Sequence, residues 1–317
     1  MKQTRRQFVH KLFVATQATL AASVLPQRLW GAGSIPGGLN FLVLGDWGRN
    51  GEKDQQDVAT QMAVAAKEFK AGFVLAVGDN FYERGVESVT DSQWQTSFEN
   101  VYSAPSLQVP WHAILGNHDY RGNCDAQIHY SRTSRRWKMP ARYFQRTEAL
   151  GGGRNADFFF IDTSPMAELG KDKLLPMAHL HSQDVGKQIA WLDSALAGSK
   201  APWKIVVGHH PVYSGGGHGD TPYLVEHVLS LMEKHQVQVY FNGHDHDLQH
   251  LQAGRVNFFC SGAGSKIRPT AQTPRTRFAK GCSGFAAVSL QPEQMQVRMI
   301  DDQGRLLYTA EVPRIQG

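Results

Sequence analysis

Cysteine is scarce in this sequence, with three residues in 317, at Cys124, Cys260 and Cys282. None of them lies in a Cys-x-x-Cys pair, which argues against a metal site built on thiolates. An exported chain could still form one disulfide and leave one free thiol. Cys260 and Cys282 flank a loop rich in glycine and arginine, so we expect these two to pair if a disulfide forms.

The sequence also lacks an apolar run long enough to span a membrane. The run at 12–25 is diluted by polar residues and is 14 residues long, whereas a spanning helix needs about 20. A twin-arginine pattern lies just before it, at Thr4–Phe8, and Gly31–Ala32 offers a cleavage site of small residues. We therefore interpret residues 1–32 as a twin-arginine signal peptide, with an amphipathic surface helix as the alternative. This predicts a periplasmic or secreted protein that uses the twin-arginine export machinery and has no stable membrane anchor.

Without the predicted signal peptide, the rest of the chain has no excess of positive or negative charge. The whole chain has a formal net charge of +5 and a pI near 9.1. Residues 1–32 hold five basic residues and no acidic one, so residues 33–317 contain 28 of each. The mature chain is therefore neutral, and we expect no nucleic-acid partner.

Residues 33–317 contain no linker, internal repeat or low-complexity tract, so we expect one domain. From Leu39 onward, short apolar runs typical of strands alternate with helical patterns, which predicts an α/β fold. Further strand-like runs between residues 257 and 312 are expected to complete a second sheet, giving a two-sheet β sandwich flanked by helices. Residues 165–187 show mixed polarity without a clear period, which is typical of a lid or binding loop.

Polar loops directly follow five of the predicted strands, and each begins with a glycine that permits a tight exit from the strand. They are Gly45-Asp46-Trp47-Gly48, Gly78-Asp79-Asn80-Phe81-Tyr82, Gly116-Asn117-His118-Asp119, Gly208-His209-His210 and Gly243-His244-Asp245-His246. Each motif alone fits an ordinary turn. Because the carboxyl ends of strands in an α/β sheet share one edge, the ordered set predicts that these loops meet. Their carboxylate, imidazole, amide and phenol groups suit a pair of hard or borderline metal ions.

The ordered loops resemble those of the metallophosphoesterases, the calcineurin-like superfamily. Tyr82, three residues after Asp79, narrows the resemblance to the purple acid phosphatases, and the loops are most similar to the small, tartrate-resistant type. The similarity extends from about Leu39 to Gly264 and includes Leu248-Gln249 and Gly262-Ala263-Gly264. It implies a sandwich with the metal site at the carboxyl ends of the strands, in a catalytic domain at residues 33–317.

The resemblance also implies which residues hold which metal. The implied ligands of Fe(III) are Asp46, Tyr82 and His246, with Asp79 as the bridge to a second ion. The implied ligands of the second ion, which would be Fe(II), Zn(II) or Mn(II), are Asn117, His209 and His244. A phenolate is a strong donor to ferric iron and would colour the protein purple, so Tyr82 is the distinguishing residue. Two such cations would provide a hydroxide nucleophile and neutralise the phosphate.

By the same resemblance, two more histidines face the substrate, where an imidazole can bind phosphate or protonate the leaving alkoxide. His118 directly follows a predicted ligand, and His218 lies in a later glycine-rich loop. The animal enzymes have an acidic residue just before the histidine that matches His218, whereas this sequence has Gly217. We therefore expect His118 to be the proton donor. His210 is interpreted as structural because His209 fills the ligand position.

The leading hypothesis is an acid phosphatase, acting as a monomer on small phosphate monoesters at mildly acidic pH. One alternative is a metallophosphodiesterase on the same scaffold that acts on nucleotides or lipid headgroups, and it would lack the colour of an iron–tyrosinate site. Another is a non-catalytic exported protein that binds iron or phosphate. That alternative predicts phosphate binding without turnover of p-nitrophenyl phosphate.

Overall fold

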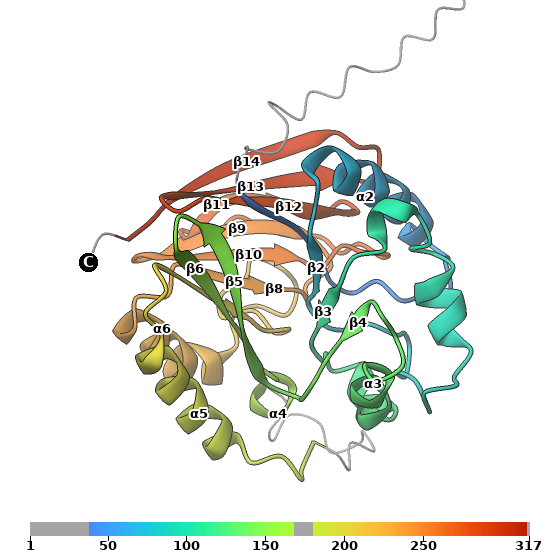
Figure 1. The fold of residues 1–317 in the computed structure, drawn as a ribbon, viewed down its shortest axis with the longest axis horizontal. Helices are drawn as coiled ribbons and strands as arrows, with labels where there is room; N and C mark the ends of the chain where they lie inside the picture. Colours follow the sequence, from blue (N-terminus) through green and yellow to red (C-terminus); the bar gives the residue numbers. More distant parts are fainter. Residues whose placement is uncertain (1–37, 168–179, 316–317) are drawn as a thin grey trace, which may run out of the picture.

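The computed structural model describes residues 38–167 and 180–315. The predicted signal peptide at 1–32 and most of the predicted lid at 165–187 lie outside this part of the chain. Two seven-stranded sheets pack against each other in the described part, and helices cover their outer faces (Figure 1). The predicted two-sheet sandwich flanked by helices is confirmed.

The first sheet combines strands from the two ends of the described chain. Its strands are β1 Leu39–Leu44, β2 Phe73–Ala76, β3 Trp111–Ala113, β4 Trp137–Lys138, β12 Gly284–Leu290, β13 Gln294–Asp301 and β14 Leu306–Pro313. They lie in the order β14-β13-β12-β1-β2-β3-β4. β1 to β4 run parallel, and β12 pairs antiparallel with β1. The prediction that the last strands complete the second sheet is therefore wrong for β12, β13 and β14, because β1 is apolar on both faces and takes a partner on each side.

The second sheet is built from the middle of the chain. Its strands are β5 Phe144–Gly151, β6 Arg154–Phe160, β7 Trp203–Val207, β8 Val239–Asn242, β9 Leu248–Ala253, β10 Val256–Ser261 and β11 Thr276–Lys280. They lie in the order β11-β9-β10-β8-β7-β6-β5, with β6, β7, β8 and β10 parallel. The sequence pattern did not predict β5, because most of its residues are exposed and it has no apolar run.

The helices lie on the outer faces of the sandwich. Their bounds are α2 Gln55–Phe69, α3 Cys124–Tyr130, α4 Ser164–Ala167, α5 Val185–Gly198 and α6 Leu229–Lys234, with π-helical segments at Trp94–Glu99 and Leu224–Val228 and short 3₁₀ turns at Pro105–Leu107 and Asp119–Arg121. α2 contacts β1 and β12, whereas α5 contacts β6 on the opposite side of the molecule (Figure 1). Within residues 38–167 and 180–315, every helix falls short of the length and apolar character that crossing a membrane requires.

The central strand β1 is buried on both faces, and its side chains alternate between two cores. Phe41 and Val43 belong to the core between the sheets, while Leu42 and Leu44 face the core under α2. The Phe41 ring stacks on Phe73 at 4.8 Å and meets Phe158 of the second sheet edge-on at 5.6 Å. This packing holds the two sheets in register around the strand that carries the first polar loop.

The parallel strands of both sheets end at a common edge, where their loops are bonded to one another. Gly45 N, just after β1, donates to Ser261 O of β10 at 2.8 Å. Gly243 N donates to His209 O at 3.1 Å, and Asp46 N donates to Gly78 O at 3.0 Å. The strand exits of one sheet are thus fixed relative to those of the other.

All three cysteines lie in the described part of the chain and are free. The Cys260 sulfur is buried at 3.4 Å from Gly243 O and 3.3 Å from Asp245 O, behind the last polar loop. The expected Cys260–Cys282 disulfide is therefore wrong: Cys260 packs against backbone carbonyls, and Cys282 lies half-buried in the loop before β12.

Candidate metal centre

The polar loops leave their strands in a backbone conformation that few residues adopt. Asp46, Asp79 and His244 have φ values of 60°, 50° and 71°. Residues other than glycine take this left-handed conformation at a cost, and they keep it where the surrounding structure demands it, often at functional sites. The loops after β1, β2 and β8 therefore each hold one predicted ligand in an uncommon conformation.

Two of the glycines that open these loops leave room for a carboxylate. A Cβ atom on Gly116 would lie 2.2 Å from Asp79 Oδ1, and one on Gly243 would lie 2.4 Å from Asp46 Oδ2. Both distances are shorter than any atomic contact allows. Glycine is thus required at these positions because the acidic side chains occupy the space that a Cβ would fill.

The side chains predicted to hold a ferric ion meet in one buried cluster. Tyr82 Oη lies 2.9 Å from Asp46 Oδ1, 2.8 Å from Asp79 Oδ2 and 3.1 Å from His246 Nε2. Each of these four side chains is at most 5% exposed. A phenol, two carboxylates and an imidazole therefore converge from loops that belong to both sheets.

The side chains predicted to hold the second ion meet beside the first cluster. Asn117 Oδ1 lies 3.1 Å from His244 Nδ1 and 3.3 Å from His209 Nε2. Asp79 lies between the two clusters: its Oδ2 faces Tyr82, and its Oδ1 is 3.5 Å from His209 Nε2. The structure thus brings all seven predicted ligands together and places Asp79 where a bridging ligand would be.

The hydrogen bonds of His209 show that this geometry fits a cation. His209 Nδ1 lies 2.9 Å from Val77 O, so this nitrogen carries the proton and donates. The lone pair of Nε2 then faces the cluster, where Asn117 Oδ1 and His244 Nδ1 each lie 3.3 Å away. An imidazole lone pair directed at other ligand atoms is the arrangement that a metal ion requires. A metal-binding histidine also commonly donates its other N–H to a backbone carbonyl, as His209 does.

Ligand atoms at suitable spacing form two overlapping groups in the described chain. Asp46, Asp79 and His209 form one, and His209, His210 and His244 form the other, with the atoms in each group within 4.8 Å of one another. His210 therefore belongs to the cluster by distance, although its Nδ1 also lies 2.9 Å from Thr163 Oγ1, as a structural role would require.

The protein alone holds this cluster under electrostatic strain. Burial, reinforced by Asp79 and opposed by His209, raises the pKa of Asp46 to about 8. Burial acts upward on Asp79 as well, but His209 and His118 outweigh it and lower its pKa to about 2. Burial and both carboxylates raise the pKa of Tyr82 well above its ordinary value. Bound cations favour the anionic form of each ligand, so they would counter the raised pKa of Asp46 and Tyr82 and reinforce the lowered pKa of Asp79.

The two predicted substrate-facing histidines lie on opposite sides of the cluster. The His118 ring lies 4.4 Å from the Tyr82 ring, and its Nδ1 is 2.8 Å from Glu83 O. The His218 ring lies 4.0 Å from the His244 ring. Both are therefore positioned to reach a molecule bound at the metal centre.

The structure adds partners that sequence reasoning missed. His218 Nδ1 lies 2.8 Å from Asp245 Oδ1, and His218 Nε2 lies 2.8 Å from Arg268 Nη1. A carboxylate can only accept and a guanidinium can only donate, which places the proton of neutral His218 on Nδ1. The carboxylate that Gly217 lacks thus comes from Asp245, whose only sequence signal is its place between His244 and His246.

Arg49 was also missed. Its guanidinium carbon lies 3.6 Å above the Tyr82 ring, and Nη1 lies 2.6 Å from Glu83 Oε1. A cation over the ring face stabilises a phenolate. Arg49 follows Gly48 in the first polar loop, but nothing in the local sequence indicates that it turns toward Tyr82.

The comparisons with known proteins agree with this geometry. The model of the calcineurin-like phosphoesterase family matches residues 39–248. Purple acid phosphatase 7 of Arabidopsis thaliana is 36% identical over 294 residues, covering 88% of this chain and 87% of the relative. Tartrate-resistant acid phosphatase type 5 of Sus scrofa is 36% identical over 296 residues, covering 87% of each.

Among solved structures, the chain is similar to GAP50, described as the anchor in the inner membrane complex of Plasmodium. The TM-score is 0.78 at 25% identity, covering 88% of this chain and 90% of that one. The converging ligands, the family match and the extent of the similarity lead to one conclusion. The chain belongs to the purple acid phosphatases of the calcineurin-like phosphoesterase family.

Proposed function

We propose that the protein is an acid phosphatase that hydrolyses small phosphate monoesters at mildly acidic pH with a dinuclear metal centre. The observation that supports this most is the position of Tyr82 Oη, within 3.1 Å of Asp46, Asp79 and His246. A phenolate is a strong donor to ferric iron, which gives this buried phenol a role as a ligand. The names of the relatives with 36% identity support the same activity.

The proposed metals follow the two clusters. Fe(III) is assigned to Asp46, Tyr82 and His246, and the second ion, Fe(II), Zn(II) or Mn(II), is assigned to Asn117, His209 and His244, with Asp79 between them. When bound, the cations would supply positive charge for the phosphate and an activated water.

The protein's own groups then orient the ester and supply a proton. His118 Nδ1 donates to Glu83 O at 2.8 Å and so cannot also accept from Arg121 Nη1, which lies 3.1 Å away. Nε2 stays available for the leaving oxygen and can protonate it when the ring is charged. Both nitrogens of His218 are occupied, by Asp245 and Arg268. This favours His118 as the proton donor. Arg268 is assigned to binding the phosphate group, which a guanidinium recognises well. His218, held by Asp245, is assigned to positioning that guanidinium.

The proposal extends to the location of the enzyme. Residues 1–32 are assigned as a twin-arginine signal peptide, which would carry the folded, metal-loaded protein to the periplasm or beyond. This part rests on the sequence alone. We propose that the exported enzyme acts as a monomer.

The visible absorbance and the hydrolytic activity of one purified sample test the metal and the reaction together. The protein should absorb visible light and hydrolyse p-nitrophenyl phosphate, with a rate that is higher at mildly acidic than at neutral pH. Turnover of bis(p-nitrophenyl) phosphate in preference to the monoester, without visible absorbance, would replace the proposal with a metallophosphodiesterase. Tight phosphate binding with no turnover of either ester would indicate a non-catalytic binding protein.

A further inference from the structure

Two adjacent histidines, His209 and His210, lie in the metal-ligand cluster. Their ligand atoms and that of His244 lie within 4.8 Å of one another. Distance alone therefore does not decide which of the two neighbouring rings binds the second ion. The hydrogen bonds of the two rings do distinguish them.

The hydroxyl of Thr163 contacts the backbone of both histidines. Thr163 follows β6 and is 0% exposed. Its Oγ1 accepts from His210 N at 2.9 Å and from His209 N at 3.2 Å. These two bonds use both acceptor positions of the hydroxyl oxygen, since a hydroxyl has two lone pairs and one hydrogen. The hydrogen is then left to be donated.

The acceptor of this hydrogen is His210 Nδ1, which lies 2.9 Å from Thr163 Oγ1. An imidazole nitrogen accepts only if it carries no proton, so neutral His210 has its proton on Nε2. Neither nitrogen of His210 then offers a lone pair to a cation. His209 has the opposite tautomer, because its Nδ1 donates to Val77 O at 2.9 Å and the Nε2 lone pair is left for the cluster.

Thr163 is itself held in place through the residue before it. Gln188 of α5 is 2% exposed and bonds both backbone groups of Asp162. Its Oε1 accepts from Asp162 N at 2.7 Å, and its Nε2 donates to Asp162 O at 3.1 Å. Because the backbone next to Thr163 is fixed in this way, the hydroxyl keeps a defined position relative to the two histidines.

The loop that carries the histidines is also held at its carbonyl end. Tyr240 Oη donates to His210 O at 2.7 Å. A Cβ atom on Gly208 would lie 2.1 Å from Tyr240 Oη and 2.9 Å from Thr163 Cγ2, and both distances are too short for a real contact. Glycine at 208 thus allows Thr163 and Tyr240 to close on the loop together.

We propose that Thr163 is a positioning residue that selects His209, and not His210, as the ligand of the second ion. It holds the backbone amides of both histidines and occupies the Nδ1 lone pair of His210. This inference rests on the proposed dinuclear centre, in which His209 is a ligand. The tautomer of His210 is nevertheless a property of the protein without metal, so it can be tested separately.

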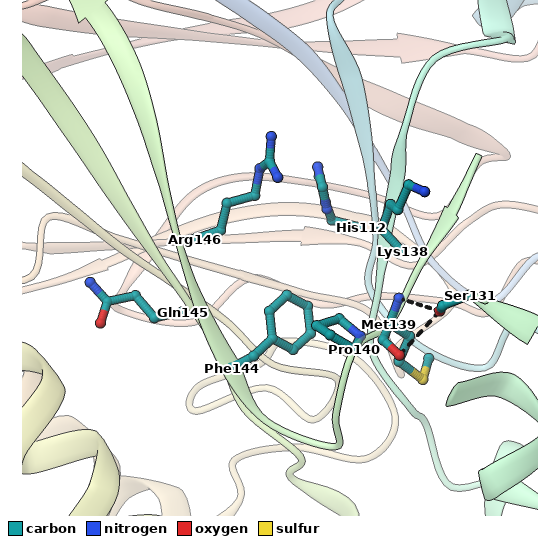
Figure 2. Close-up of a pocket in the computed structure, with 8 residues that line it drawn as sticks. All are labelled: His112, Ser131, Lys138, Met139, Pro140, Phe144, Gln145 and Arg146. Carbon is teal, nitrogen blue, oxygen red and sulfur yellow. Dashed lines mark hydrogen bonds between the residues drawn. The ribbon is translucent and has the colours of Figure 1, made fainter. Parts of the chain in front are cut away.

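The first test is nitrogen NMR of the imidazole rings in full-length protein freed of metal with a chelator. Signals are assigned by their loss in His209→Gln and His210→Gln. The wild type should show a proton on Nδ1 of His209 and on Nε2 of His210. Thr163→Val, which keeps the side-chain shape without the hydroxyl, should change the signals of His210, whereas Thr163→Ser should keep them. Buried His112, which lines a pocket with residues of β4 and β5 (Figure 2), should keep its signals in both variants.

The second test is calorimetric titration of Zn(II) into the same metal-free protein. The wild type should bind two ions, and Thr163→Val should bind one of them about 10- to 100-fold more weakly, the usual cost of losing a group that orients a metal ligand. Thr163→Ser should restore the affinity. Ser199→Ala is the matched control at the end of α5 and should bind both ions as the wild type does. Ser199 Oγ likewise accepts from a backbone amide, Ala201 N at 3.3 Å, and donates to a side chain, Asp157 Oδ2 at 2.6 Å.

A proton on Nδ1 of His210 in the wild type would overturn the proposal, and this result needs no variant to fold. Equal zinc affinities of Thr163→Val and the wild type at both sites would overturn it as well. The predicted tautomers and zinc affinities in a protein that hydrolyses no phosphate ester would support the role of Thr163 and refute the proposed function instead.

Discussion

At the scale of single residues, Tyr82 and its neighbour Phe81 show how the chain separates packing from chemistry. Phe81 packs against Trp94 at 4.7 Å and Trp47 at 5.5 Å in the core under α2. Tyr82 turns the other way, and its hydroxyl contacts two carboxylates and an imidazole. Since burial and both carboxylates oppose ionisation of this phenol, a cation is needed to stabilise the phenolate.

Replacing Tyr82 by Phe should abolish the visible absorbance and lower the rate of p-nitrophenyl phosphate hydrolysis by about 100-fold or more, because the proposed ferric site would lose a ligand. Absorption spectra and iron analysis of the purified variant check this. Tyr213→Phe, a similarly buried tyrosine outside the cluster, is the control and should keep both properties. A Tyr82→Phe protein that stays purple would contradict the assignment.

His112 should make folding stability sensitive to acid. Burial lowers its folded pKa from 6.5 to about 3, so the unfolded chain binds a proton that the folded one excludes. The stabilisation is fully present above pH 6.5 and is lost progressively between pH 6.5 and 3. Between pH 7 and 5, the wild type should lose about 2 kcal/mol more than His112→Phe in urea unfolding. His129→Gln, at an exposed position, should keep the slope of the wild type.

At the scale of elements, the loops that directly follow the parallel strands carry the predicted ligands. Five parallel strands, β1, β2, β3, β7 and β8, are followed by a glycine and a polar residue, and the sequence shows this directly. The loops at Asp46, Asp79, Asn117, His209 and His244 could be located because both signals are local.

The prediction failed where a feature depends on distant residues. β12 pairs with β1 through contacts such as Leu290 with Leu39, and no local pattern indicates which sheet an apolar strand joins. The carboxylate beside His218 comes from Asp245 in another loop, so a search next to His218 could not find it. The expected Cys260–Cys282 disulfide was inferred from spacing, whereas the depth of Cys260 behind the last loop depends on the fold.

Gly116→Ala tests the geometry of a strand exit. The added methyl group would overlap Asp79 Oδ1 and push this carboxylate out of place, so hydrolysis should fall more than about tenfold and the metal content should decrease. Gly72→Ala is the matched control, because its methyl group would meet only Asn40 O at an ordinary 3.8 Å. Full activity of Gly116→Ala would mean that the enzyme tolerates a displaced Asp79 carboxylate, and it would contradict the prediction.

At the scale of the whole molecule, the candidate centre joins the two sheets. Asp46, Asp79 and Asn117 follow strands of the first sheet, whereas His209 and His244 follow strands of the second. Cations shared by these loops would therefore stabilise the docking of one sheet on the other.

Removing the metals should lower the melting temperature by roughly 10 °C, because binding to the folded state contributes about 3–4 kcal/mol at ordinary excess. Calorimetry before and after chelation measures this, and adding iron back should restore the original value. An unchanged melting temperature in protein shown to be free of metal would contradict a stabilising role.

The export proposal also belongs to this scale. Changing Arg5 and Arg6 to Lys should keep the enzyme inside the cell, because the twin-arginine machinery reads this pair. Cell fractionation with a phosphatase assay measures the distribution. Arg28→Lys, which changes a third arginine of the same segment, should leave export intact. Normal export of the double variant would refute the assignment.

The pairing of β12 with β1 makes the last strands of the chain part of the same folding unit as the first strand. Every predicted metal ligand lies before residue 247, and the family match ends at 248, so the metal site takes no ligand from β12, β13 or β14. Yet a chain that ended before β12 would leave β1 with an unpaired, apolar margin on the side opposite β2. Such a margin recruits other chains and leads to aggregation. The carboxyl-terminal strands β12, β13 and β14 therefore cover the margin of β1 that would otherwise be open to such pairing.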